Sequence, residues 1–370
     1  IILGLVADPY YVFGTPLWPG INAVKPAAPE HAALAKTVLL QRSRPHTLLL
    51  GNSRVDVGID PASPEWPAAM RPVFNAALAG RDLTIAARLL DEALAAPGSA
   101  LREVVVGVDF LDFLERPLTR AGPNPDEARF RVNADLSPNP AWRWAWAEDA
   151  ARATLTLGAV TDSLLTLLAQ HRAGSPTLTP LGFHPLDEYR DEVRRHGFRP
   201  LFEQKQAQYA ATYAALPRPD FTHPEGLRNR RALAHILRVS AAHGVRLSLI
   251  LYPYHAWLLD LLREQGLAAE FDAWKRLLVA TVAEQGPPGR TRIIDFSGYG
   301  PLTTEAVPPP GDLTTEMRWY WEPGHFRPAL GDRIIRRLLG TETGFGRDLT
   351  PATAAETIRE SGLVPPPGGQ

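Results

Sequence analysis

The segment Thr47-Leu48-Leu49-Leu50-Gly51-Asn52-Ser53-Arg54 decides the fold, because an apolar run with strand character ends there in glycine, asparagine and serine. An uninterrupted apolar run is typical of a strand buried on both faces of a parallel sheet. In open α/β sheets, ligands and catalytic groups collect outside the carboxyl ends of the strands. The segment therefore predicts an α/β fold and makes Ser53 a candidate functional residue.

Segments with strand character alternate with helical patterns along the rest of the chain. The first predicted strand covers about 46–51, and the others are residues 73–75, 103–109, 245–251 and 291–296. The predicted helices are residues 83–95, 227–243, 256–285 and 326–339. This alternation predicts a flavodoxin-like three-layer sandwich with a mostly parallel sheet of about five strands and right-handed crossovers.

Composition divides the chain into three parts. Residues 1–44 are predicted as an extended lead-in with a short helix over 31–44, and residues 45–340 as the α/β domain. Within that domain, proline-rich segments alternate with helical ones from about 112 to 225, which predicts a helical insertion. Residues 341–370 are small, polar and proline-rich, and we expect an irregular or partner-bound tail.

The chain begins with the apolar segment Ile1-Ile2-Leu3-Gly4-Leu5-Val6, which is too short for a bilayer span of about 20 residues. Two interpretations stay open. The segment is either the remnant of a transmembrane anchor or signal sequence, or an ordinary N-terminal strand. The first interpretation predicts a periplasmic or extracytoplasmic protein, anchored by an N-terminal transmembrane helix that is missing from this chain.

Composition excludes several kinds of site. The 370 residues include no cysteine, which rules out disulfides, thiolate metal sites and cysteine nucleophiles. A formal net charge of −1 argues against a general electrostatic nucleic-acid binder. The ten histidines show no spacing typical of metal ligands, and no glycine-rich nucleotide-binding motif is present. We therefore expect no cofactor and no metal; a phosphate site at the Gly51 turn has no motif behind it.

A serine at a strand end becomes a nucleophile only with an adjacent base and a group that orients the base. The segment Glu322-Pro323-Gly324-His325 supplies both, because Pro and Gly predict a tight turn that presents Glu322 and His325 to one cleft. Ser53 would attack an acyl carbon, His325 would take the proton, and Glu322 would orient the imidazole. The backbone N–H groups of Ser53 and Gly80 are the predicted oxyanion donors.

Each candidate also has a simpler interpretation. Ser53 can cap the following helix, His325 can pack at a helix start, and Glu322 can be a solvated carboxylate near a helix N-terminus. The tryptophans at 142, 144 and 146 form either a sugar-stacking platform or a core or membrane-facing packing element.

Four further polar residues are possible substrate-binding or supporting groups. Asn75 either adds an oxyanion donor or braces its loop. Arg54 either binds a substrate anion or carbonyl, or forms an ion pair with Asp56 or Asp109. We interpret Asp109 as a strand-end residue that buttresses the site, and His255 as an alternative base or a hydrogen-bonded histidine at a helix start.

Three short motifs resemble blocks one, two and five of the SGNH (GDSL-type) hydrolases: Gly51-Asn52-Ser53, Gly80 and Glu322-Pro323-Gly324-His325. The flanking residues look most like membrane-anchored envelope members, such as alginate O-acetyltransferases and the lipoteichoic acid D-alanylation protein. The resemblance covers roughly 45–110 and 245–340. The chain departs from the family pattern at Asn52, at Asp109, where the third block has an asparagine donor, and at Glu322, where an aspartate is usual.

The resemblance implies serine-dependent acyl-ester chemistry, either an O-acetyltransferase or an esterase, on a cell-envelope glycan. The alternative function is a catalytically weak or inactive SGNH-like scaffold or accessory subunit of a membrane-associated complex. The expected partners are a glycan or acyl-ester substrate and a membrane-protein or envelope-assembly partner, with no nucleic acid.

Overall fold

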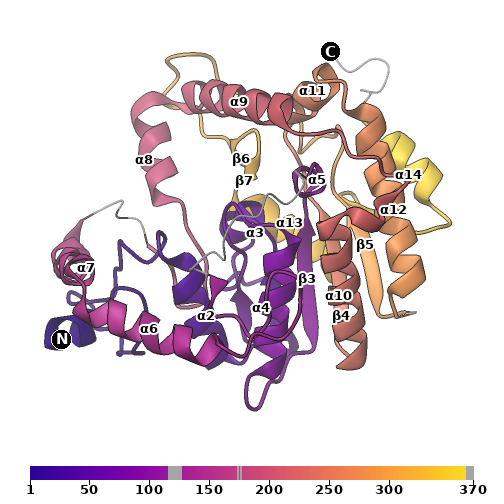
Figure 1. Cartoon of the computed structure of the whole chain (residues 1–370). Helices are drawn as coiled ribbons and strands as arrows, with labels where there is room; N and C mark the ends of the chain where they lie inside the picture. Colours follow the sequence, from indigo (N-terminus) through magenta and orange to yellow (C-terminus); the bar gives the residue numbers. More distant parts are fainter. Residues whose placement is uncertain (116–126, 173–174, 176, 288, 364–370) are drawn as a thin grey trace.

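The computed structural model describes residues 1–115, 127–172, 175, 177–287 and 289–363. Its centre is a six-stranded sheet with the order β2-β1-β3-β4-β5-β8 (Figure 1). The first five strands are parallel, and β8 is antiparallel to β5 at one edge. The strands are β1 (Thr47–Leu50), β2 (Val73–Asn75), β3 (Glu103–Val108), β4 (Arg246–Leu251), β5 (Thr291–Asp295) and β8 (Arg347–Asp348).

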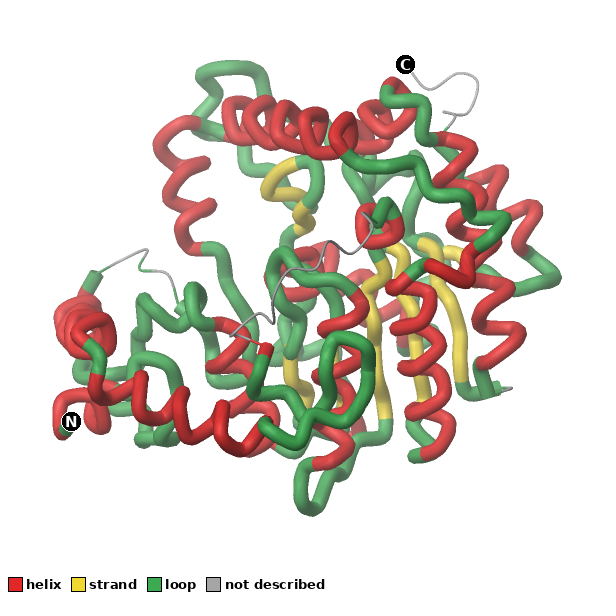
Figure 2. The backbone as a smooth tube through the Cα atoms, in the orientation of Figure 1, coloured by secondary structure: helices red, strands yellow, loops and turns green. Residues whose placement is uncertain are grey.

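Helices cover the sheet, as the alternating pattern predicts, and the flavodoxin-like three-layer sandwich is confirmed. The helix α10 packs against α4 and α12, while α3 packs against α13. Figure 2 shows the strands side by side with helices around them. The helices of this domain are α3 (Ser53–Gly58), α4 (Leu83–Ala95), α10 (Arg228–Ala242), α11 (Ala256–Glu264), α12 (Ala268–Gln285) and α13 (Pro328–Leu338), with short 3₁₀ turns at 68–70 and 224–226.

The central strands are buried because their side chains are apolar on both faces. Leu48, Leu49 and Leu50 of β1 are completely buried, as is Val106 of the neighbouring β3. At Gly107 a Cβ atom would lie 2.1 Å from the hydroxyl of Tyr252, so only glycine fits beside that ring. The apolar runs thus form the strands. Gly107 leaves room for the Tyr252 ring to pack beside β3.

The predicted helical insertion is present. It contains α5 (Phe110–Phe113), α6 (Trp142–Leu155), α7 (Leu157–Leu168), a 3₁₀ turn at 169–171, α8 (Asp187–His196) and α9 (Phe198–Ala215). The 18-residue α9 crosses above the ends of the strands in Figure 1 and packs against α11 and the small hairpin strand β6 (Tyr320–Glu322). The helix α9 of the insertion therefore contacts the hairpin strand that carries Glu322.

The N-terminal segment folds against the insertion. Residues Ile2–Ala7 form the helix α1, so the second of the two interpretations, an ordinary N-terminal strand, is wrong. The predicted helix over 31–44 is confirmed as α2 (Ala32–Ser43). The hydroxyl of Tyr10 donates to Asp162 of α7, and α1 itself packs on α7. In the described part of the chain, no helix is both long enough and apolar enough to cross a bilayer.

The tail is more ordered than its composition predicts. Instead of an irregular segment from 341, the chain forms β8 and then α14 (Ala354–Glu360), which packs on α12. Directly after α14, the buried Ser361 receives two hydrogen bonds from the Lys275 ammonium and donates one to Asp295. This buried polar cluster fixes the segment. Residues 364–370 lie outside the described residues.

Candidate active site

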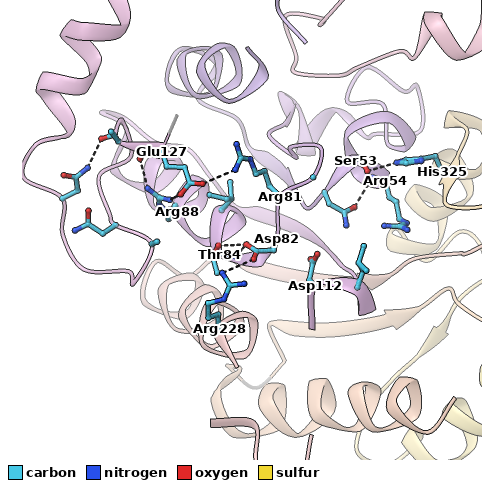
Figure 3. A pocket seen from close by; sticks show the side chains of 18 of the residues that line it. Ser53, Arg54, Arg81, Asp82, Thr84, Arg88, Asp112, Glu127, Arg228 and His325 are labelled. Carbon is cyan, nitrogen blue, oxygen red and sulfur yellow. Dashed lines mark hydrogen bonds and ion pairs between the residues drawn. The ribbon is translucent and has the colours of Figure 1, made fainter. Parts of the chain in front are cut away.

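Ser53, His325 and Glu322 meet at the carboxyl end of β1, where Figure 3 shows the serine and the histidine. The Ser53 Oγ atom lies 2.7 Å from Nε2 of His325, although the two residues are 272 positions apart in the chain. The other ring nitrogen, Nδ1, is hydrogen-bonded to Oε1 of Glu322. The predicted three residues therefore form a continuous hydroxyl–imidazole–carboxylate chain, which is the arrangement a serine nucleophile requires.

Ser53 is held by a sharp turn between β1 and α3. It is the first residue of α3, and the side chain of Asn52 caps the helix by accepting the Arg54 N–H at 3.1 Å. Gly51 has a φ of +145°, and a Cβ there would lie 2.7 Å from the Tyr252 hydroxyl. The helix cap is thus supplied by Asn52, not by Ser53, and the serine hydroxyl stays available to His325.

A two-stranded hairpin holds the acid and the base. The tight turn predicted at Pro323–Gly324 connects β6 to β7 (His325–Phe326), so the helix α13 begins two residues later than predicted. The Gly324 N–H donates to Oε2 of Glu322 at 3.0 Å and fixes the carboxylate. A Cβ at Gly324 would lie 2.1 Å from the Tyr209 hydroxyl, so the turn requires glycine.

Glu322 is completely buried and is not the solvated carboxylate of the simpler interpretation. Burial acts to raise the pKa of Glu322, but the charge and hydrogen bond of His325, the Gly324 N–H and the Arg54 charge together lower it below its usual value. A buried carboxylate that stays ionised stabilises an imidazolium beside it. Glu322 thus has both the position and the charge of an orienting acid.

The two predicted oxyanion donors border one cleft. Ser53 and Gly80 both line it, and in the described part of the chain neither backbone N–H has a protein acceptor. Gly80 has a φ of +67° and open space where a Cβ would be, so glycine is needed there for backbone conformation. Both groups are therefore free to bind an oxygen atom of a ligand.

Asn75 braces the loop and does not act as a donor to the cleft. Its side-chain nitrogen donates to the backbone oxygens of Val55 at 2.8 Å and Ile59 at 3.0 Å, at the end of α3. Its side-chain oxygen accepts the Ala77 N–H at 3.1 Å. The brace joins α3 to the 75–80 loop, and so positions Ser53 relative to Gly80.

Asp109 and Arg54 form a buried ion pair beneath the nucleophile. Asp109 is fully buried and accepts hydrogen bonds from Asn52, from the Tyr254 hydroxyl at 2.6 Å and from the Leu111 N–H at 3.1 Å. The ion-pair interpretation of Arg54 is thus confirmed for Asp109, while Asp56 instead pairs with Lys36 at 2.6 Å. Asp109 is a buttress, as expected.

Three tyrosine rings surround the Arg54 guanidinium, at 5.1 to 6.0 Å from its central carbon: Tyr209, Tyr252 and Tyr254. The Nε and Nη2 atoms of Arg54 are buried and have no hydrogen-bond partner. The guanidinium therefore stabilises the Asp109 carboxylate, and Arg54 also lines the cleft at Ser53, so a substrate-binding role for it stays a prediction.

His255 lies at the start of a helix with both ring nitrogens used. Its Nδ1 accepts the Trp257 N–H at 3.2 Å, and its Nε2 contacts the backbone oxygen of Glu305 at 2.8 Å. Burial lowers the pKa of His255 from 6.5 to about 4. It also packs edge-on against Tyr320 of the hairpin. His255 is therefore the hydrogen-bonded helix-start histidine and not an alternative base.

The cleft at Ser53, which we call the Ser53 cleft, has a volume of about 670 Å³ and extends away from the triad toward residues 127–139 (Figure 3). Most of its wall is not predicted by any sequence motif. The polar residues that sequence reasoning missed are Arg81, Asp82, Thr84, Arg88, Asp112, Glu127, Asn133, Asn139, Tyr209 and Arg228. They come from loops and helices without a shared pattern, so only the fold brings them together. The tryptophans of α6 do not line this cleft.

Charges in the Ser53 cleft are largely paired. Arg81 and Arg88 both contact Glu127, at 3.2 and 2.6 Å. Arg228 lies 3.8 Å from Asp82. The cleft thus presents many hydrogen-bonding groups, and its arginines are paired with carboxylates, two of them with the same glutamate.

Burial, together with the nearby charges of Asp109 and Asp82, raises the pKa of Asp112, another acid of the cleft, well above its usual range. Among the described residues, no cluster of three or more metal-ligating side chains occurs.

No protein-family model matches the chain, and no curated protein matches it. A proposal of function therefore rests on the side chains of the Ser53 cleft.

Proposed function

We propose that the protein is a serine-dependent acyl-ester enzyme of the SGNH type, an O-acetyltransferase or esterase acting on a cell-envelope glycan. The observation that carries the proposal is the 2.7 Å contact between Ser53 Oγ and His325 Nε2, with Nδ1 of the same ring on the buried Glu322. The N–H groups of Ser53 and Gly80, which line the same cleft and have no acceptor among the described residues, add support.

In the proposed reaction, the Ser53 oxygen forms a bond to the acyl carbon while its proton passes to Nε2 of His325. The carbonyl oxygen takes up the negative charge and is stabilised by the N–H groups of Ser53 and Gly80. When the intermediate collapses, the bond to the leaving alkoxide breaks and the alkoxide receives the proton from His325. The acyl group is then an ester of Ser53.

The second half of the reaction repeats these steps with a hydroxyl group as nucleophile. If water attacks the acyl-enzyme, the protein is an esterase; if a sugar hydroxyl attacks, it is a transferase. The volume of the Ser53 cleft and the many hydrogen-bonding side chains in its wall favour a hydroxyl-rich substrate such as a glycan.

The test is labelling with a fluorophosphonate probe, which reacts with activated serines. We expect the wild-type protein to be labelled, and labelling to be lost in Ser53→Ala and strongly reduced in His325→Ala. Ser99→Ala removes an exposed serine that does not line the Ser53 cleft and is the matched control, expected to be labelled normally. A folded wild-type protein with no Ser53-dependent labelling would rule out acyl transfer.

The second candidate is a membrane-associated scaffold, and one surface favours it. Apart from Leu313, every large apolar side chain that is exposed among the described residues lies at the N-terminus, in the 17–21 segment, or on α6 or α7. These residues are Ile1, Ile2, Leu5, Val6, Leu17, Trp18, Ile21, Trp144, Leu155, Leu157, Val160, Leu164, Leu165 and Leu168. An apolar surface of this kind is typical of contact with a membrane or a membrane protein.

We also propose an extracytoplasmic, membrane-associated location, and the apolar surface supports the membrane-associated part of it. Flotation with phospholipid vesicles tests it: the wild-type protein should float with the vesicles, and a Leu157→Ser/Leu164→Ser/Leu168→Ser variant should not. If the variant keeps normal Ser53 labelling, membrane association and catalysis are separate properties. If the wild-type protein stays in the soluble fraction, the vesicle-binding role is wrong.

A further inference from the structure

The side chain of Asn52 lies next to the nucleophile and lines the same cleft. Two of its hydrogen-bonding positions are occupied: Oδ1 accepts the Arg54 N–H at 3.1 Å, and Nδ2 donates to Oδ2 of Asp109 at 2.6 Å. A carboxamide nitrogen carries two hydrogens. The second hydrogen of Asn52 Nδ2 has no acceptor among the described residues.

The carboxamide is held rigidly by what surrounds Asp109. That carboxylate is completely buried and accepts four hydrogen bonds, from Asn52, Arg54, Tyr254 and the Leu111 backbone. Because Arg54 pairs with it, the carboxylate is neutralised, and it does not line the Ser53 cleft. Asp109 can therefore fix the orientation of the amide without placing an uncompensated negative charge beside the reacting oxygen.

We propose that Asn52 is a third oxyanion donor, with its free Nδ2 hydrogen on the negatively charged oxygen and its other hydrogen anchored by Asp109. This inference rests on the proposed acyl-ester function. The carboxamide would join the N–H groups of Ser53 and Gly80 around one oxygen atom. Donors that are fixed before the reaction stabilise the developing charge without reorganising, which is why removing one usually lowers kcat by about 100-fold or more.

The two ends of the Asn52–Asp109 hydrogen bond have different roles. Asn52 touches the reacting oxygen, whereas Asp109 is a positioning residue that acts through Asn52. A purely structural bond would work equally well with its donor and acceptor exchanged. A catalytic amide would not work after the exchange. The exchange places a carboxylate at position 52, in the cleft, and the amide at position 109, outside it.

The experiment measures hydrolysis of p-nitrophenyl acetate by the full chain, with circular dichroism as the check of folding. Asn52→Ser keeps a side-chain oxygen that caps α3 but removes the amide donor. We expect its kcat to fall about 100-fold with little change in KM, since the contact forms only with the oxyanion. Asn52→Asp should fall at least as far.

The exchange variant Asn52→Asp/Asp109→Asn separates the two roles. We expect its thermal stability to exceed that of the Asn52→Asp single variant, because the donor–acceptor pair is restored, while kcat stays low. Recovery of kcat in the exchange variant, or near-normal kcat in folded Asn52→Ser, would overturn the proposal. If the exchange variant does not fold, the Asn52→Ser result decides alone.

Failure of the inference is distinguishable from failure of the proposed function. When wild-type protein turns over the ester and Ser53→Ala does not, the acyl-ester function stands whatever Asn52 does. Absence of any Ser53-dependent turnover or labelling in the wild-type protein would remove both.

Discussion

The hydroxyl of Tyr209 lies 3.4 Å from Oε1 of Glu322, the same carboxylate oxygen that is bonded to His325. Tyr209 belongs to α9 of the insertion, and Glu322 belongs to the hairpin β6–β7 of the α/β domain. The ring of Tyr209 also occupies the space where a Cβ at Gly324 would lie. The insertion therefore contacts both the acid of the triad and the turn that positions it.

The first prediction concerns this contact. Gly324→Ala should destabilise the protein by about 1–3 kcal/mol and reduce kcat, because the new methyl group overlaps Tyr209 and displaces the hairpin. Tyr209→Ala removes the overlapping ring, so the double variant should be less destabilised than the sum of the single variants. Urea unfolding of the four proteins in a double-mutant cycle measures the coupling. Additive effects would show that the two positions do not meet.

The second prediction concerns the charge of Glu322. Glu322→Gln should keep the fold but lower kcat by about 10³–10⁴-fold, since a neutral amide neither stabilises the imidazolium nor selects the required tautomer. Steady-state kinetics and Ser53 labelling measure the loss. Glu316→Gln, an exposed glutamate before the hairpin, is the matched control and should have normal kinetics. Equal activity of both variants would contradict the orienting role.

The same carboxylate predicts an acid limit to stability. The folded protein lowers the pKa of Glu322 below its ordinary value of 4.5. Glu322 therefore contributes stability that is fully present above about pH 4.5 and is lost as the pH falls through the lower folded value. Urea midpoints below pH 4.5 should fall less steeply in Glu322→Gln than in the wild-type protein. A parallel pH dependence in the two proteins would argue against an ionised Glu322.

The third prediction concerns His255, whose pKa is lowered from 6.5 to about 4 by burial. Between these values the unfolded chain binds more protons than the folded protein, so stability should decrease as the pH falls from about 6.5 toward about 4. The contribution of this group is at most about 3 kcal/mol. His255→Asn keeps a helix cap and should show a weaker decrease between about pH 7 and about pH 5 in urea unfolding. The control is His243→Asn, an exposed histidine, which should behave as wild type.

The fourth prediction concerns the tail. Ser361→Ala should lower the free energy of unfolding by about 1–3 kcal/mol, because it leaves the buried Lys275 and Asp295 short of a hydrogen-bonding partner. Lys275→Met should cost about 3–5 kcal/mol, since it leaves the Asp295 carboxylate buried without its cation. Urea unfolding at neutral pH measures both, with Ser99→Ala as the exposed control. Unchanged stability in Ser361→Ala would mean that the tail does not contribute to the core.

The sheet is predictable from short windows of sequence because its signals are local. Apolar runs such as 48–50 and 104–108 have few ways to be buried other than as central strands, and Gly51 ends the first of them where the chain must turn. The tail departs from its prediction because its composition resembles that of a loop. The burial of Ser361 against Lys275 and Asp295 is a long-range contact that no short window of sequence contains.

The sequence by itself determined which side chains are available for chemistry: a serine at a strand end, and an acid and a histidine three residues apart. Only the tertiary structure decided which hydrogen bonds they make. In the folded protein, Ser53 contacts His325, and Tyr209 contacts Glu322. Both ring nitrogens of His255 and both polar ends of the Asn75 amide make structural hydrogen bonds. The physical reason is that a hydrogen bond requires atoms about 3 Å apart, and packing between distant segments alone sets those distances.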